Sequence, residues 1–319
     1  MVGRYADIKK SRVEWFWQPY VPFGKITLIQ GDPSEGKSTL ALKLAASAST
    51  GGNLPDGSKL AAPVNVIYQC LEDGIADTII PRLERVGANV KHVFFIQEDG
   101  RPTRMLDQEK IEQVIRSTKA GILIIDPIQT VLGKLTHGGE CGVVRSYMDM
   151  LATVANQTGC AVMLIGHLNK NESGKELYRG LGSIDIVAAA RSVIRVERIR
   201  EGSSVRVIRH IKSSLSREGE DFAFEIDSNG EINWVGVVNA TDEGEEIVEQ
   251  AKKGKTKKND RVLGKLRTML EKGDLPYSVI AEKTKCLSGV RTLNEAKKKL
   301  GIQSIKKADG WYWHLPKEG

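Results

Sequence analysis

The nine residues GDPSEGKST, at positions 31–39, constrain the fold of this chain more than any other segment. They fit the pattern G-x-x-x-x-G-K-[S/T], with Gly31, Gly36, Lys37 and Ser38 at the fixed positions. The apolar run KITLIQ precedes them, and the run TLALKLAAS, with apolar residues three and four apart, follows. The sequence therefore predicts a buried strand that leads through a glycine-rich turn into a helix.

The residue types of this turn suit a phosphate-binding loop, or P-loop. Glycines let backbone N–H groups wrap around phosphates, and the N-terminus of a helix favours anionic charge. Lys37 would reach the β- and γ-phosphates, and Ser38 would supply a hydroxyl ligand for Mg²⁺. The alternative, a glycine-rich turn without a ligand, is disfavoured by its position between a strand and a helix. We expect ATP and Mg²⁺ as cofactors, with nucleotide contacts from Gly31, Asp32, Pro33, Ser34, Glu35, Gly36, Lys37, Ser38 and Thr39.

Two later apolar runs end in polar residues of chemical interest. Asp126 ends GILIID, and ligands bind at the carboxyl ends of strands in open α/β sheets. An Asp after a strand is more often a helix cap or turn residue, but beside a P-loop it is a candidate Mg²⁺ ligand, directly or through water. His167 ends VMLIGH, where it is placed to hydrogen-bond the γ-phosphate or its attacking water, although a lone His is usually structural.

Residues 26–235 alternate short apolar runs with helix-like stretches, which predicts an α/β fold with a mainly parallel sheet covered on both faces. After residue 192 the runs follow one another closely, so we expect an antiparallel extension of the sheet. The expected strands are 26–29, 64–70, 93–96, 122–125, 162–165, 192–197, 205–211 and 222–226.

Positive charge is concentrated at the C-terminal end of the chain. The net charge is +7, yet residues 251–319 hold 18 Lys and Arg against 7 Asp and Glu. Such asymmetry predicts a polyanion-binding appendage, with nucleic acid as the favoured polyanion. We expect an ATPase domain at 1–239, a charged flexible linker at 240–259 and a small DNA-binding domain at 260–319.

The segment 260–319 has the pattern of three short helices followed by a hairpin around Asp309 and Gly310. This is the layout of a winged helix, whose third helix is the recognition element. Basic helices are often only solvated faces, and winged helices also serve as protein docking modules. Trp311 and Trp313 share one face of the last strand and are expected to pack on the helices. The expected DNA contacts of this domain are Arg291, Asn294, Lys297 and Lys298.

Composition argues against a membrane or secreted protein. The sequence has no apolar run near the roughly 20 residues that a membrane span needs, and the N-terminus lacks the apolar core of a signal peptide. The four cysteines are dispersed, which favours reduced thiols. We therefore expect a cytoplasmic protein.

Taken in order, the P-loop, the acidic stretch CLEDG, the run IIDP and the run beginning GHLNKNESGKELYRGLGS resemble the RecA-like ATPases. The likeness spans roughly residues 21–230 and is strongest to the hexameric helicases of the plasmid RepA type, with DnaB, RadA and KaiC as more distant relatives. A combination of motifs in one order is much more specific than any single motif. The resemblance implies a homo-oligomeric ATPase, in our expectation a hexamer, that acts on DNA.

The resemblance also implies roles for residues beyond the P-loop. Glu72 corresponds to the catalytic carboxylate that polarises the attacking water, because Pro127, the residue after Asp126, is unable to do so. Its neighbour Asp73 is expected to cap the next helix. A basic residue from the adjoining subunit stabilises charge on the γ-phosphate in this family. The matching run VRVIRHIKSS offers Lys212 first and Arg209 second, although such residues are often the solvated face of a strand.

Two polar, glycine-containing segments, 132–142 and 168–183, match the loops that contact DNA in RecA-like proteins. Ordinary surface loops have a similar composition. The candidate phosphate contacts are Lys134, Lys170, Lys175 and Arg179.

Two functions remain open from the sequence. The first is a RepA-type replicative DNA helicase or translocase, in which single-stranded DNA passes through the ring and the C-terminal domain contacts duplex DNA. The second is a non-motor DNA-binding regulator or a recombination or repair mediator, in which ATP only switches the assembly. Both use the same ATP site, so the motifs do not separate them.

Overall fold

The computed structural model describes residues 2–103, 107–135, 142–168, 184–238, 247, 262–271, 273–284, 290–307 and 310–316. The chain divides into two compact units, Met1–Ile247 and Val248–Gly319. Within the described segments, no helix has the length and apolar character needed to cross a bilayer.

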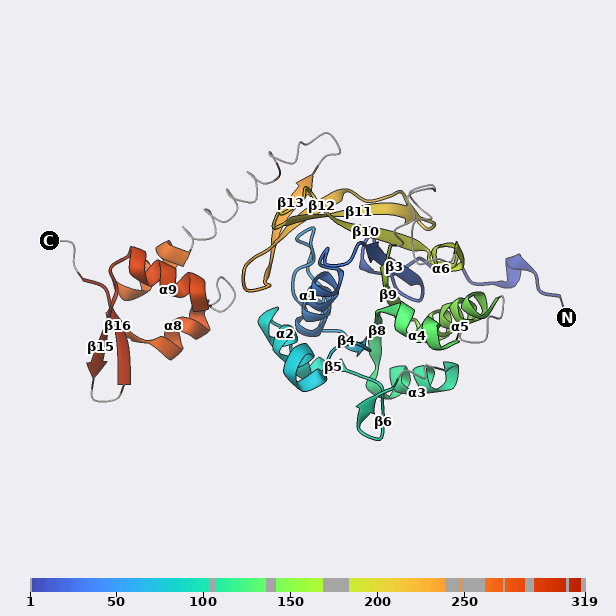
Figure 1. The fold of residues 1–319 in the computed structure, drawn as a ribbon, viewed down its shortest axis with the longest axis horizontal. Helices are drawn as coiled ribbons and strands as arrows, with labels where there is room; N and C mark the ends of the chain where they lie inside the picture. Colours follow the sequence, from blue (N-terminus) through green and yellow to red (C-terminus); the bar gives the residue numbers. More distant parts are fainter. Residues whose placement is uncertain are drawn as a thin grey trace. The chain divides into compact units, whose positions relative to one another are not determined.

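The first unit is built on a central sheet, which in the described residues has nine strands in the order β13-β12-β11-β10-β3-β9-β8-β4-β5 (Figure 1). Neighbouring strands from β10 to β5 are parallel, and the pairs from β10 to β13 are antiparallel. The expected parallel sheet with an antiparallel extension is therefore confirmed. The strands are β3 (Ile26–Gly31), β4 (Asn65–Cys70), β5 (Val93–Phe94), β8 (Ala120–Asp126), β9 (Ala161–His167), β10 (Ser192–Arg198), β11 (Val205–Ser213), β12 (Asp221–Ile226) and β13 (Ile232–Val238).

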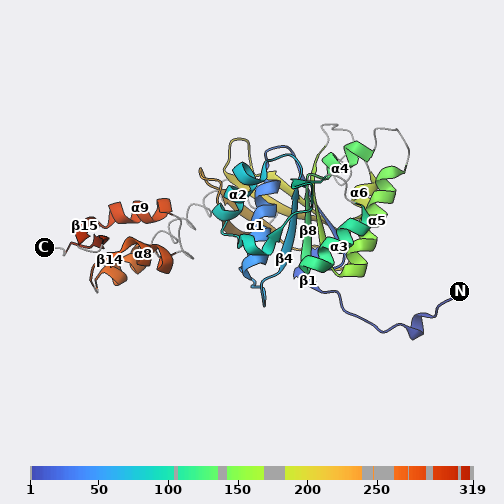
Figure 2. The same ribbon diagram turned by 90° about the horizontal axis from the view of Figure 1, so that it is seen from below.

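Helices cover both faces of this sheet, as Figure 2 shows. One hydrophobic core joins α1 and α2 to the sheet, and a second joins α3, α4, α5 and α6 to the opposite face. A strand buried on both faces needs an almost continuous apolar sequence, which accounts for runs such as ILII. The helices are α1 (Lys37–Thr50), α2 (Ile80–Arg85), α3 (Gln108–Thr118), α4 (Ile128–Leu135), α5 (Val143–Thr158) and α6 (Ile184–Ala189).

Shorter elements complete the first unit. The rings of Trp17 and Tyr20 stack at 4.0 Å and pack against Phe222 of β12, so the aromatic segment before β3 belongs to the core. The remaining elements are the 3₁₀ turns η1 (Tyr5–Asp7) and η3 (Val90–His92), the π-helical turn η2 (Ile75–Ile79), and the short strands β1 (Trp15–Trp17), β2 (Val21–Pro22), β6 (Gln97–Glu98) and β7 (Arg101–Pro102).

The structure differs from the sequence-based expectation in two elements of this unit. β13 is an additional strand whose residues Trp234 to Val237 are only partly buried or exposed, so its apolar pattern was weak. The segment expected as a loop from residue 132 begins inside α4. Ile128, Val131 and Leu132 are three or four apart and buried, and this spacing is that of a packed helix.

The second unit contains a helix at 262–270, α8 (Tyr277–Thr284), α9 (Val290–Lys299) and a three-stranded sheet in the order β14-β16-β15. The strands are β14 (Leu275–Pro276), β15 (Gln303–Lys307) and β16 (Gly310–His314). Val262, Leu266, Ile280, Leu293 and Trp313 belong to its own hydrophobic core. Trp313 is 4% exposed, as expected, but Trp311 is 61% exposed, so the expectation that it packs on the helices is wrong.

Candidate functional site

Strand register brings together the polar residues that follow β3, β4, β8 and β9. Gly31 pairs with His167, and Cys70 pairs with Asp126. The Leu71 N–H donates to the Asp126 carbonyl oxygen at 3.1 Å, which places the start of the CLEDG turn beside the end of β8. Because the carboxyl ends of parallel strands meet at one edge, the P-loop, Glu72, Asp126 and His167 share one site.

The loop between β3 and α1 has the backbone of a phosphate cradle. A Cβ on Gly31 would lie 2.2 Å from the Val196 carbonyl oxygen, so only glycine fits there. Gly36 has φ +91° and is the N-cap of α1 without any side-chain cap, which leaves the first N–H groups of the helix to a ligand. Asp32, Pro33, Ser34 and Glu35 form the loop itself, while Lys37, Ser38 and Thr39 begin α1. This geometry fits the phosphates of a nucleotide.

Lys37 lies inside this loop. Its side chain is buried, and Nζ donates to the Asp32 carbonyl oxygen at 2.7 Å. Burial lowers the pKa of Lys37, while the negative charges of Asp126, Asp32 and Glu35 act against that shift. An ammonium group held at the start of the helix by the loop suits a contact with a β- or γ-phosphate.

Asp126 lies beside two side-chain hydroxyl groups. The Tyr68 hydroxyl donates to Asp126 Oδ2 at 2.6 Å. Burial raises the pKa of Asp126, and the hydroxyl groups of Tyr68 and Ser38 oppose that rise. A hydroxyl and a carboxylate oxygen close together fit the oxygen ligands that Mg²⁺ prefers.

Glu72 lies beside this pair, exposed at the end of the strand that follows the P-loop helix. The Thr130 hydroxyl of α4 donates to Glu72 Oε1 at 3.2 Å, which orients the carboxylate. Asp73 does not cap the following helix, contrary to expectation. The N-cap is Gly74, without a side-chain cap, and Asp73 forms an ion pair with Arg82 at 2.7 Å.

His167 completes the edge. Its Nδ1 is buried and has no hydrogen-bond partner in the described structure. Burial lowers the pKa of His167, and the Lys37 charge lowers it further, while Glu72 and Asp126 raise it. Because His167 pairs with Gly31, its imidazole lies at the edge where the P-loop begins. A neutral imidazole with an unsatisfied nitrogen suits a hydrogen bond to a phosphate or to water.

Sequence reasoning missed three residues that support this site. Tyr68 and Thr130 hold the two carboxylates, and Arg198 of β10 binds the P-loop itself. The Arg198 guanidinium donates to the Ser34 carbonyl oxygen at 3.3 Å and lies 3.5 Å from Glu35 Oε1. Tyr68 stands four residues before Glu72 on a strand, which was the only signal, and the other two contacts depend on tertiary structure alone.

The two candidates for a subunit-interface cation both lie on β11 and have partners within the chain. Arg209 forms ion pairs with Glu197 and Asp221. The Lys212 ammonium donates to the Val187 and Ala190 carbonyl oxygens at 2.7 and 2.8 Å, at the C-terminal end of α6.

The predicted DNA contacts are only partly described. Lys170, Lys175 and Arg179 lie outside the described residues, as do the side chains of Lys134 in α4 and Arg291 in α9. Asn294 and Lys298 are exposed on α9. Lys297 Nζ donates to Ser304 Oγ at 2.6 Å and lies 4.9 Å from the centre of the Trp313 ring.

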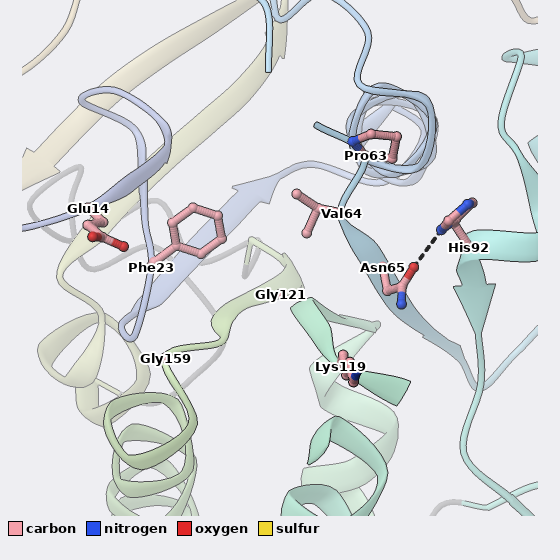
Figure 3. Close-up of a pocket in the computed structure, with 9 residues that line it drawn as sticks. All are labelled: Glu14, Phe23, Pro63, Val64, Asn65, His92, Lys119, Gly121 and Gly159. Atoms are coloured by element: carbon pink, nitrogen blue, oxygen red, sulfur yellow. Dashed lines mark hydrogen bonds between the residues drawn. The ribbon is translucent and has the colours of Figure 1, made fainter. Parts of the chain in front are cut away.

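A pocket lies at the other edge of the sheet (Figure 3). Asn65 and Gly121, at the amino ends of β4 and β8, line it together with Phe23, Val64 and His92. His92 Nδ1 is 2.6 Å from Asn65 Oδ1. Parallel strands place their amino and carboxyl ends at opposite edges, so this pocket is separate from the P-loop site.

Comparison with known proteins agrees with this geometry. Residues 2–173, over half of the chain, match the family model described as an AAA domain. The chain is 30% identical over 211 residues to the DNA repair protein RadA of Halalkalibacterium halodurans, and 27% identical over 211 residues to that of Bacillus subtilis. Each match covers 65% of this chain but only 40% of the relative.

Solved structures give the same fold. The KaiC-like protein of Pyrococcus horikoshii has a TM-score of 0.50 at 18% identity, covering 67% of this chain and 90% of that one. The strand order, the P-loop, the carboxylates at the sheet edge and the family match together identify the chain as a member of the AAA domain family and as a RecA-like P-loop ATPase related to DnaB, RadA and KaiC.

Proposed function

We propose that the chain is a cytoplasmic, Mg²⁺-dependent ATPase that acts on DNA, with a RepA-type replicative helicase or translocase as the first candidate. One observation carries the proposal. Lys37, Asp126, Glu72 and His167 converge at the edge where the P-loop opens, and each carboxylate is oriented by a hydroxyl group. Preorganised charge of this kind is the main means by which proteins catalyse phosphoryl transfer.

Each residue then has a defined task. The P-loop N–H groups and Lys37 bind the nucleotide phosphates, and Ser38 and Asp126 would hold Mg²⁺, which neutralises charge on the transferred phosphoryl group. Glu72 accepts a hydrogen bond from the attacking water and aligns it with the γ-phosphorus. His167 donates a hydrogen bond to the γ-phosphate or to that water, and its strand leads into the segment 168–183.

The adjacent acidic residues Glu72 and Asp73 provide a matched test. Glu72→Gln is expected to retain binding of a fluorescent ATP analogue and to lose hydrolysis, whereas Lys37→Ala weakens both. Asp73→Asn is the control, because Asp73 forms an ion pair with Arg82. This variant is expected to hydrolyse ATP at a rate near that of the wild type. Hydrolysis by Glu72→Gln at the wild-type rate would contradict the catalytic role.

We further propose a homo-oligomeric ring, a hexamer, with Lys212 or Arg209 acting on the nucleotide of the neighbouring subunit. Lys212 pairs with Val193 at the amino end of β10, whereas its own P-loop follows the carboxyl end of β3, which is parallel to β10. This register places the Lys212 backbone level with Leu28, before the P-loop of the same chain, which supports a role at the neighbouring subunit. Mixing inactive Lys212→Ala and Lys37→Ala proteins is expected to restore activity in shared sites, and the absence of any restoration favours a structural role.

DNA contacts are proposed in two places. Lys134, Lys170, Lys175 and Arg179 would meet single-stranded DNA in the ring. The C-terminal unit has the helix and strand order of a winged helix, and Asn294 and Lys298 are exposed on α9. Each lysine that neutralises a phosphate contributes about 0.7–0.9 to the slope of log affinity against log salt, so Lys298→Ala is expected to reduce that slope. An unchanged slope would remove Lys298 from the interface.

The RadA relatives are DNA repair proteins, which favours a second candidate, a recombination or repair mediator switched by ATP. Strand displacement separates the two candidates. A helicase displaces a fluorescent strand when it hydrolyses ATP, whereas a mediator shows DNA-stimulated hydrolysis without displacement.

A further inference from the structure

Trp311 is an exposed indole in a strongly basic unit. It lies on β16 and is 61% exposed, whereas Trp313, two residues further on, is 4% exposed and belongs to the hydrophobic core. Both side chains lie on the same face of the strand because side chains alternate. The core formed by the described residues of the unit therefore ends before Trp311, and packing among these residues does not account for an indole at this position.

A cationic residue pairs with Trp311 across the hairpin. Trp311 is directly opposite Lys306 in the β15–β16 ladder, so the two side chains lie side by side on one face of the sheet. Lys306 is exposed. Two residues away on each strand, and on the same face, Ser304 is opposite Trp313. Lys297 of α9 contacts both Ser304 and Trp313. The face thus continues from the C-terminal turn of α9 to an exposed indole beside an exposed ammonium group.

We propose that Trp311 stacks on an unpaired base of single-stranded DNA while Lys306 contacts an adjacent phosphate. This deepens the proposed function and rests on its claim that the C-terminal unit binds DNA. A flat aromatic ring matches the face of any base, and a lysine beside it supplies the charge for the backbone. The bases of a duplex already stack on one another, so the indole selects unpaired bases. The 11 excess positive charges of residues 251–319 favour a polyanion over a protein partner.

Substitutions separate the two contacts. Stacking of one base contributes about 1–3 kcal/mol, so Trp311→Ala is expected to weaken single-strand binding by about tenfold, and Trp311→Phe to retain most of the affinity. Trp311→Ala leaves the salt slope unchanged because no charge is lost. Lys306→Ala lowers that slope by about 0.7, the value for one phosphate of a single strand. Tyr5→Ala is the control, an exposed aromatic residue of the other unit that is expected to change nothing.

The experiment uses the full chain without nucleotide, a short fluorescein-labelled single strand and the same sequence as a blunt duplex. Fluorescence anisotropy over a salt series gives affinity and slope. Acrylamide quenching of tryptophan fluorescence is a second readout: Trp17 and Trp313 are buried and Trp15 and Trp234 are half-buried, whereas Trp311 is exposed to the quencher. The single strand is expected to protect wild-type fluorescence from quenching and to give less protection in Trp311→Phe, which lacks the reporting indole.

The outcomes are distinct. If the wild-type chain binds neither DNA, the proposed function fails and this inference fails with it. If it binds and Trp311→Ala binds the single strand as tightly as wild type, only this inference is overturned. Equal losses for single strand and duplex, or equal losses for Trp311→Phe and Trp311→Ala, also overturn base stacking.

Discussion

Replacing Tyr68 by Phe removes one hydroxyl group and isolates its role beside the nucleotide site. That hydroxyl donates to Asp126 Oδ2 at 2.6 Å, and Asp126 is only 6% exposed. A hydrogen bond to a charged group contributes about 1.5–3 kcal/mol, and a buried carboxylate oxygen left without its donor incurs a cost of that size. We expect Tyr68→Phe to lower the free energy of unfolding by about 2 kcal/mol. For a unit of this size that is a fall in Tm of about 4–8 °C.

The second effect concerns the proposed metal. The Tyr68 hydroxyl donates to Oδ2 and so orients the carboxylate, beside the Ser38 hydroxyl. Loss of such an orienting group typically weakens metal binding by about 10- to 100-fold, so the Mg²⁺ concentration for half-maximal stabilisation by nucleotide is expected to rise about tenfold. Differential scanning fluorimetry over a Mg²⁺ series at fixed nucleotide concentration measures both quantities.

Tyr20→Phe is the matched control. The Tyr20 hydroxyl is also bonded within the fold, to the Glu220 carbonyl oxygen, but it lies away from the P-loop. This variant is expected to lower Tm without shifting the Mg²⁺ midpoint. A Tyr68→Phe protein with wild-type Tm and midpoint would refute the reasoning.

Three further predictions concern other parts of the first unit. Burial lowers the pKa of His210 to about 4, so the unfolded state binds a proton more readily than the folded state. The contribution of the neutral His210 to the free energy of unfolding is therefore fully present above about pH 6.5. It falls by at most about 3 kcal/mol as the pH drops to 4. Urea unfolding at pH 7 and pH 5 checks this, because the free energy of unfolding should fall more between these two pH values in the wild-type chain than in His210→Gln. Arg198→Ala removes the contacts to the Ser34 carbonyl oxygen and Glu35, so we expect weaker binding of a fluorescent nucleotide with an unchanged Tm. Unchanged nucleotide binding would exclude a role for Arg198 in holding the P-loop. Gln69→Leu removes three buried hydrogen bonds to Ile96 and Thr103 and is expected to cost about 3 kcal/mol, seen as faster hydrogen exchange in the 96–103 hairpin; unaltered exchange contradicts it.

The sequence predicted what depends on local patterns. The P-loop could be recognised because glycine, lysine and serine occur at fixed spacing between a strand and a helix. Asp126 and His167 could be selected as candidates because each is a polar residue at the end of an apolar run. The parallel character of the sheet and its antiparallel extension followed from the alternation of strands and helices and its end after residue 192, whereas the order of the strands came only from the structure.

Contacts between distant segments had no comparable signal. Tyr68 reads as one more apolar residue of β4, and only the pairing of β4 with β8 brings its hydroxyl to Asp126. Thr130 approaches Glu72 because α4 begins directly after β8. Trp311 was expected to be buried from its alternation with Trp313, but alternation gives the face of a strand and not the point at which the core ends.

Phosphate release from ATP, measured with and without single-stranded DNA, tests the central claim most directly. The wild-type chain is expected to release phosphate in a Mg²⁺-dependent manner, faster with DNA, and Glu72→Gln to release none while still binding nucleotide. Release that is unaffected by DNA, or that continues undiminished in Glu72→Gln, would contradict a DNA-stimulated ATPase whose water is aligned by Glu72.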